Sequence, residues 1–166
     1  TLSDQARIFG KLNGLKPFSK EMALPSPAVT IAEFQAGTSE AEVLQVLQQL
    51  NAFEEVEYAN PFLVHSDGTL QGIQDRFAVK LKSPSGLAKL QALTKDAGAV
   101  IDSKYEYDPL LYFIRVSKSS SGNALELANR FAESNLFEFS EPDFLLLLKK
   151  FNTNDPSLAM QWALNN

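Results

Sequence analysis

The chain has 166 residues, with 15 Lys and Arg against 20 Asp and Glu, and 45% of its residues are hydrophobic. This length and composition are typical of one ordinary globular domain. The net charge of −5 and the lack of a dense basic stretch disfavour nucleic acid as a partner, because phosphate binding requires a positive surface. No apolar run reaches the roughly 18 residues that a transmembrane helix requires, so the sequence predicts no membrane span.

The residue types that are missing restrict the chemistry further. There is no cysteine, and His65 is the only histidine. A disulfide, a thiolate nucleophile, a thiolate zinc site and a two-histidine metal site are therefore excluded. We expect no metal and no cofactor. The chain opens at Thr1 without Met and without a signal peptide, which we interpret as processing or trimming.

The first 72 residues predict a strand, a helix and a second strand after an irregular extension. Residues 1–27 form a weakly amphipathic extension that prolines interrupt. Residues 28–34 alternate like a strand, the apolar spacing over 40–50 predicts a helix, and residues 53–64 return to strand character. Turn residues and glycines over 66–72 are typical of a connection between two units.

The remainder of the chain predicts an α+β fold. The expected strands and helix starts are 76–81, a helix after Ser83, 100–107, 110–116, a helix from Ala124 and 137–144. Gly98 is a typical C-terminal stop for the first of these helices. The order βαββαβ is that of a ferredoxin-like domain, which we place at residues 73–148. Residues 28–72 repeat its last strand–helix–strand order and predict a partial βαβ repeat, a ferredoxin-like half-unit, ahead of it.

Two segments permit a catalytic interpretation beside a structural one. Gly37-Thr38-Ser39 also surrounds the catalytic serine of subtilisin-like proteases, but the residues Glu40-Ala41-Glu42 that follow favour a helix cap. His65 lies beside Ser66 and Asp67, yet neighbours in sequence do not have the geometry of a catalytic triad. We therefore predict a helix start for the first segment and an exposed turn for the second.

The acidic residues give no further sign of catalysis. Asp102, Asp108 and Asp143 stand in separate segments, and nothing in their spacing marks an acid–base pair. An enzyme would need convergent polar groups in a pocket, and the sequence offers no candidate set. We predict a non-catalytic chain.

Four consecutive leucines, Leu145 to Leu148, precede Lys149 and Lys150. One interpretation is a last core strand. The other is an extended segment offered to the groove of a partner, where backbone pairing binds and side-chain pockets select. Both interpretations remain open from the residues alone.

The end of the chain resembles a known family. Asn154-Asp155-Pro156, a short gap, then Gln161-Trp162-Ala163-Leu164-Asn165 is similar to the start of the catalytic domain of bacterial subtilisin-like serine proteases. Residues 76–145, with Glu141-Pro142-Asp143 at their end, resemble the N-terminal propeptides of those enzymes in the order of strands and helices. Residues 149–166 would then be the linker and the start of the catalytic region, and the catalytic triad is absent from this chain.

The resemblance implies a folding chaperone and inhibitor. Such propeptides are ferredoxin-like domains whose sheet packs against two surface helices of the protease and whose C-terminal tail occupies the substrate cleft. Glu141 and Asp143 would cap the N-termini of those two helices. The residues of the tail would be Leu145, Leu146, Leu147, Leu148 and Lys149.

The resemblance also implies a partner and a location. The partner would be a subtilisin-like catalytic domain, in cis or in trans, and the chain would be secreted or periplasmic. The alternative is a ferredoxin-like interaction or structural module with no protease partner, because one fold hosts many functions.

Overall fold

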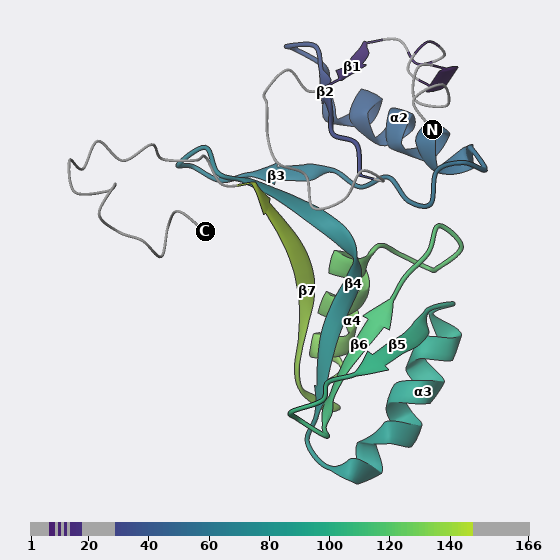
Figure 1. The fold of residues 1–166 in the computed structure, drawn as a ribbon, viewed down its shortest axis with the longest axis vertical. Coiled ribbons are helices and arrows are strands. Elements are labelled where there is room, and N and C mark those ends of the chain that lie inside the picture. Colours follow the sequence, from purple (N-terminus) through teal and green to yellow (C-terminus); the bar gives the residue numbers. More distant parts are fainter. Residues whose placement is uncertain (1–6, 9, 11, 13, 18–28, 148–166) are drawn as a thin grey trace, which may run out of the picture.

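A computed structural model describes residues 7, 8, 10, 12, 14–17 and 29–147 of the chain (Figure 1). Its elements in chain order are β1 (Leu15–Pro17), β2 (Ala32–Phe34), α2 (Glu40–Ala52), β3 (Phe62–Val64), β4 (Leu70–Leu81), the short 3₁₀ helix η1 (Pro84–Gly86), α3 (Leu87–Asp96), β5 (Val100–Lys104), β6 (Leu111–Arg115), α4 (Ala124–Glu133) and β7 (Phe137–Leu147). The molecule is thus of mixed α and β structure, and a five-stranded antiparallel sheet is its main element.

Strand β4 is the centre of that sheet. It pairs with β6 along one edge and with β7 along the other, and β5 extends the sheet beyond β6. The order β7-β4-β6-β5 follows from these pairings, and every pair is antiparallel. At its other end β4 continues past β6 and pairs with β3, over Leu70–Gly72.

A register break divides the β4–β7 pair into two parts. Ile73 lies opposite Phe144 and Phe77 opposite Pro142, so three residues of β4 face the single residue Asp143. Such a bulge bends a strand and increases its twist. We call residues 62–64, 70–73 and 144–147 the arm, and the remaining strands with α3 and α4 the body.

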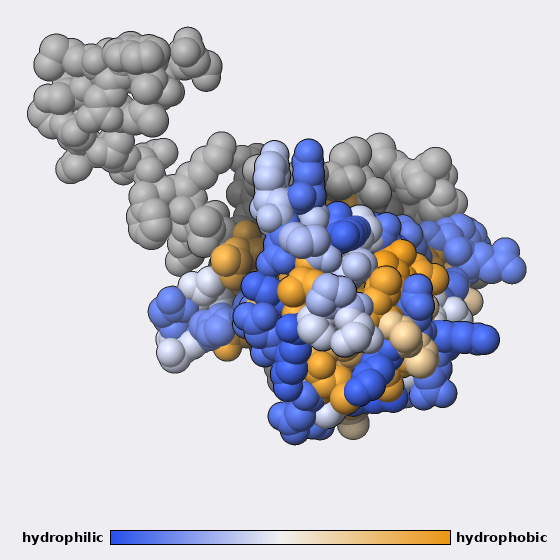
Figure 2. All heavy atoms as spheres, turned by 90° about the horizontal axis from the view of Figure 1, so that it is seen from below, coloured by the Kyte–Doolittle hydropathy of each residue, from blue (hydrophilic) through white to orange (hydrophobic). Residues whose placement is uncertain are grey.

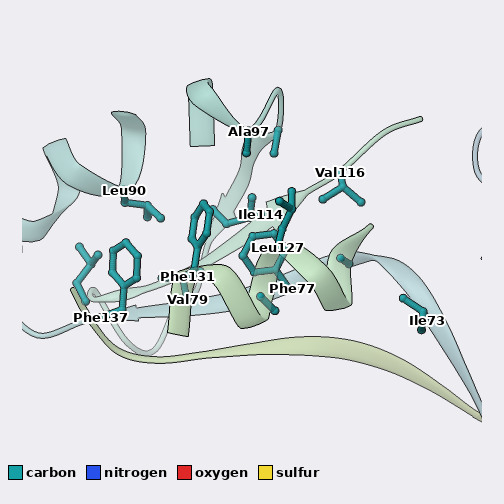
Figure 3. Close-up of a cluster of buried hydrophobic side chains, with 14 residues drawn as sticks. Ile73, Phe77, Val79, Leu90, Ala97, Ile114, Val116, Leu127, Phe131 and Phe137 are labelled. Atoms are coloured by element: carbon teal, nitrogen blue, oxygen red, sulfur yellow. The ribbon is translucent and has the colours of Figure 1, made fainter. Parts of the chain in front are cut away.

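One face of the body sheet forms the core with α3 and α4. Side chains alternate along a strand, so Phe77, Val79 and Leu81 of β4 point to one face, and all three are buried. They form one cluster with Leu90 of α3 and Leu127 of α4, which places both helices on this face (Figure 3).

Aromatic rings fill the centre of this core. The ring of Phe131, from α4, meets Phe77 edge-on with centroids 5.2 Å apart and stacks on Phe137 at 5.7 Å. Edge-to-face and offset-stacked arrangements are the preferred geometries of aromatic pairs. Helix α4 is thereby fixed against β4 and β7 at once.

Local sequence signals explain how the helices begin and end. Ser39 caps α2 and Asn123 caps α4, each in a reciprocal capping box, with Glu42 and with Glu126 respectively. Gly98 follows α3 with φ +64°, a conformation that favours glycine. The predicted cap at Gly37-Thr38-Ser39 and the predicted stop at Gly98 are both confirmed.

Two predictions for the first half of the chain are wrong. The connection predicted at 66–72 is instead a tight hairpin, since the His65 N–H donates to Thr69 O at 3.0 Å and β4 begins at Leu70. The strand predicted at 53–64 is reduced to β3. Its first part stays out of the sheet because side chains satisfy its backbone groups: Lys118 Nζ donates to the carbonyls of Phe53 and Val56 at 2.8 and 3.1 Å.

The first copy of the predicted repeat differs from the second in its pairing. Strands β6 and β7, which flank α4, both pair with β4. Strands β2 and β3, which flank α2, belong to different sheets, because β2 pairs with β1 and β3 pairs with β4. The order strand, helix, strand is present in both copies, but only the second builds one sheet.

Candidate functional site

The face of the body sheet opposite the two helices is the candidate site. Its side chains alternate with the buried ones along each strand, and cross-strand partners share the face. We call it the open face; it carries Arg76, Ala78 and Lys80 of β4, Leu111, Phe113 and Arg115 of β6, and Phe139, Glu141 and Asp143 of β7. All nine residues are half-buried or exposed. In the end-on view of Figure 2, apolar side chains are exposed in patches between hydrophilic ones.

An aromatic cluster lies at one side of the open face. Tyr105 meets Phe113 edge-on at 6.2 Å and Tyr107 at 5.6 Å, and the Arg76 guanidinium lies 4.8 Å above the Phe113 ring. Tyr107 is 80% exposed. Tyrosine and arginine are enriched among the residues that dominate binding energy at protein interfaces. The cluster therefore has the composition and exposure that are common at protein interfaces.

Ion pairs fix most of the charges on this face. Arg115 bonds Asp75 at 2.6 Å and Asp102 at 2.9 Å. The hydrogen bond from Arg115 holds the pKa of the Asp102 carboxyl below its usual range, and the bond to Asp102 raises the pKa of Arg115. Asp102 and Arg115 therefore keep opposite charges near neutral pH, and this ion pair is a fixed feature of the charge pattern of the face.

A second set of charges surrounds Lys80. Its ammonium group lies 3.1 Å from Asp108 and 3.6 Å from Glu138. The hydrogen bond to Asp108 raises the pKa of Lys80. The pKa of Asp108 is lowered first by the N–H of Leu110 and then by Lys80. The positive charge of Lys80 is therefore balanced by two carboxylates of the chain itself.

The structure places the two predicted acidic residues, Glu141 and Asp143, together on the open face, but they differ in their hydrogen bonds. Asp143 Oδ2 accepts from Arg76 Nε at 3.1 Å and from Nη2 at 2.7 Å. Glu141 is exposed, and its side chain makes no hydrogen bond or ion pair with another described residue. Of the predicted pair, Glu141 is the one whose side chain has no ion-pair partner among the described residues.

The predicted tail residues fall at the limit of the structure. Leu145, Leu146 and Leu147 are the last residues of β7 and pair with Gly72, Gln71 and Leu70. Their backbone groups thus pair with β4 on one edge, as expected of a last strand. That they also contact a protease stays a prediction. Leu148 and Lys149 lie outside the described residues.

The other candidates of the sequence do not assemble into a site. His65 bonds Gln71 at 2.5 Å, while Asp67 caps its own turn by accepting from the N–H of Thr69. Asp102 and Asp108 each bond a different cation. In the part of the chain that the structure describes, no three His, Cys, Asp or Glu side chains are grouped so as to hold a metal ion.

Two small hollows lie in the described residues, both beside the N-terminal half. The larger, of about 300 Å³, is lined by Leu12, Gln49, Ala52 and Phe53 and holds no titratable group. The smaller, of about 140 Å³, includes Tyr58, whose pKa is raised chiefly by burial. The smaller hollow is also lined by Ser117, Ser120 and Lys118, but the ammonium group of Lys118 donates to the backbone carbonyls of Phe53 and Val56.

Sequence reasoning missed the aromatic cluster and the cations of the open face. A signal was present, because Tyr105 and Tyr107 are two residues apart within the strand predicted at 100–107, as side chains on one face must be, although β5 itself ends at Lys104. Arg76 and Phe113 meet only through the pairing of β4 with β6, which no local pattern specifies.

Comparison with known proteins gives no relative. No protein-family model, no curated protein and no solved structure matches this chain. Among the helices of the described residues, none has the length and apolar character needed to cross a membrane. The function is therefore inferred from the chain's own residues.

Proposed function

We propose that this chain is a propeptide-type chaperone and inhibitor of a subtilisin-like serine protease and is not itself catalytic. Its body would be a ferredoxin-like domain whose open face docks on the catalytic domain, in cis or in trans. The chain would act in a secreted or periplasmic setting. The order β7-β4-β6-β5 and the sequence of elements βαββαβ support this assignment of the fold.

The observation that carries the proposal is the one-sided sheet. Both helices of the body lie on one face, so the other face is left with the aromatic cluster and with Glu141. Exposed apolar and aromatic surface beside a polar rim is typical of a protein-interaction site. The exposed carboxylate of Glu141, which bonds no other described residue, is suited to the positive N-terminus of a helix on another protein.

The direction of the chain gives further support. Strand β7 contributes Glu141 to the open face and ends at Leu147, and residues 154–166, which resemble the start of a protease catalytic domain, follow in the sequence. One continuous strand therefore links the docking face with the segment that would enter the cleft.

The test is an inhibition assay with the whole chain against a panel of subtilisin-like proteases. A version ending at Leu147 keeps β7 complete and removes everything after it. The variant Tyr107→Ala removes an anchor that is 80% exposed, and Leu44→Ala, at a position 52% exposed on α2, is the matched control. We expect inhibition that weakens at least about tenfold for the truncated chain and for Tyr107→Ala, as for an interface hot spot, and stays unchanged for Leu44→Ala.

The chaperone activity needs its own measurement. The chain should accelerate refolding of the denatured catalytic domain of any protease that it inhibits, because it would bind the transition state of folding. If no protease of the panel is bound or inhibited, the proposal is rejected in favour of an interaction module without a protease partner.

A further inference from the structure

Hydrogen bonds between side chains and backbone groups hold residues 51–64 against the body and the arm. The Asn51 amide group bonds both backbone groups of Ala59, at 3.0 and 2.7 Å. Lys118, from the loop before α4, donates to the carbonyls of Phe53 and Val56 at 2.8 and 3.1 Å. The segment therefore follows a fixed course from α2 to β3 without belonging to a sheet before Phe62.

The same segment reaches the bulge between arm and body. Asn60 Nδ2 lies 3.2 Å from the carbonyl oxygen of Ile73 and 3.4 Å from that of Gln74. Gln74 is one of the three residues of β4 that face the single residue Asp143, and Ile73 is the last paired residue before them. The Asn60 amide thus donates to two consecutive carbonyls at the bulge, and these bonds hold the bend of β4 against residues 51–64.

Beyond Asn60 the segment becomes a strand of the arm. Phe62–Val64 pair with Leu70–Gly72, the residues to which Leu145–Leu147 pair from the other edge. The Phe62 ring covers Gly72, where an added Cβ would lie 2.7 Å from the ring. Without β3 the arm would be a two-stranded ribbon, which is marginally stable in water, whereas three strands form a more stable unit.

We propose that residues 51–64 are a positioning element that fixes the direction of the arm, and hence the direction in which the chain leaves the body at Leu147, with Asn60 as its main positioning residue. The inhibitory consequence rests on the proposed function. An arm already ordered in the free protein lowers the entropy that a following tail segment must lose when it binds a cleft. Residues 51–64, which are not part of the body, would thus fix the direction of the arm.

The first test is the variant Asn60→Ala in the whole chain. The matched control is Lys82→Ala, which removes a bond of 2.6 Å from a side chain to the carbonyl of Asn135 in the body. Amide hydrogen exchange is measured over residues 70–72 and 145–147 of the arm and over 77–81 of the body. We expect exchange in the arm to become about tenfold faster in Asn60→Ala and to stay unchanged in the control, with the body unaffected in both.

A rescue experiment separates positioning from a general loss of stability. Val64 and Leu70 are opposite each other, next to the hydrogen-bonded pair of His65 and Thr69, so they form the closely spaced kind of pair. Their Cα atoms should be about 4.5 Å apart, within disulfide range. Val64→Cys with Leu70→Cys introduces the only two cysteines of the chain. Oxidation should restore slow exchange in the Asn60→Ala background, and reduction should abolish it.

The outcomes distinguish this proposal from the proposed function. Unchanged exchange in the arm of Asn60→Ala overturns the positioning role. Faster exchange with an unchanged inhibition constant, where the parent chain inhibits, overturns the link between arm and tail. Faster exchange that oxidation reverses, in a chain that inhibits no protease, supports the positioning role and rejects the proposed function. If Asn60→Ala does not fold, the oxidised pair in the parent chain must slow exchange in the arm, and failure to do so overturns the proposal.

Discussion

Replacing Glu141 or Asp143 by lysine should affect inhibition and fold stability differently, because only Asp143 is ion-paired within the described residues. Glu141→Lys is expected to weaken inhibition and leave the fold intact, because the Glu141 side chain is exposed and bonds no other described residue. Asp143→Lys is expected to weaken inhibition and also to destabilise the fold, because it removes the partner of Arg76.

The expected cost in stability follows from the geometry of the ion pair. The side chains of Arg76 and Asp143 are 37% and 30% exposed, so the bonds at 2.7 and 3.1 Å are partly screened by water. Loss of such a pair costs about 1 kcal/mol rather than the 3–5 kcal/mol of a fully buried one. A lysine placed beside Arg76 adds roughly 1 kcal/mol of repulsion. Asp143→Lys should therefore lower the free energy of unfolding by about 2 kcal/mol, and Glu141→Lys by less than about 0.5 kcal/mol.

The expected loss of binding is set by the dipole of the partner helix. A carboxylate at a helix N-terminus contributes about 0.3–1 kcal/mol, and a lysine replaces this attraction by repulsion. The sum of about 0.6–2 kcal/mol corresponds to an inhibition constant raised roughly 3- to 30-fold.

The assay combines urea unfolding with an inhibition titration on the same samples. The control is Glu133→Lys, an exposed position in α4 on the far side of the sheet with the same change in net charge. Equal weakening of inhibition by Glu141→Lys and Glu133→Lys would show that net charge, not the position of Glu141, matters. Unchanged stability of Asp143→Lys would refute the energetic role given to the ion pair.

Three further predictions concern the body alone. Phe131→Ala should lower the free energy of unfolding by about 3–5 kcal/mol in urea, since the ring is buried between two others and leaves a cavity. Ser140→Ala should be neutral or stabilise by up to about 1 kcal/mol, because the buried Ser140 hydroxyl has no hydrogen-bond partner among the described residues; a clear loss of stability would contradict this. The pKa of Asp108 is lowered by the Leu110 N–H and then by Lys80, so its charge stabilises the fold above about pH 4 and this contribution disappears as the pH falls through the folded pKa. Asp108→Asn should therefore be less stable than the parent at pH 7 and equal to it near pH 2, and a difference independent of pH in thermal unfolding would exclude the charge as its cause.

Local signals in the sequence were enough for the helices and for the body strands. Ser39 with Glu42 begins α2 as its capping sequence predicts, and Gly98 ends the turn after α3. Alternation over residues 76–81 correctly separated the core side chains from those of the open face. Each of these features depends on residues a few positions apart, where spacing alone decides the structure.

Features that depend on distant residues were not predictable. Asp143 and Arg76 are 67 positions apart and Arg115 and Asp75 are 40 apart, and only the pairing of the strands brings them together. The arm was missed for the same reason, because residues 70–72 have few side chains typical of a strand and are ordered by partners on both edges. The family resemblance implied an acidic pair at Glu141 and Asp143, but no local pattern indicated that Arg76 pairs with Asp143.

The central place of β4 has a consequence for synthesis on the ribosome. Of the strands that flank it, β6 and β7 are made later, and the register joins Val79 to Ser140. Until residues 137–147 have left the exit tunnel, Phe77 and Val79 lack one neighbouring strand, so a nascent chain leaves part of this apolar core uncovered. Pairing over such distances is slow because a long loop must close before any contact forms. A chain arrested before Phe137 should therefore show no protected amides in β4, and the domain should close only as the segment after Leu147 is being made.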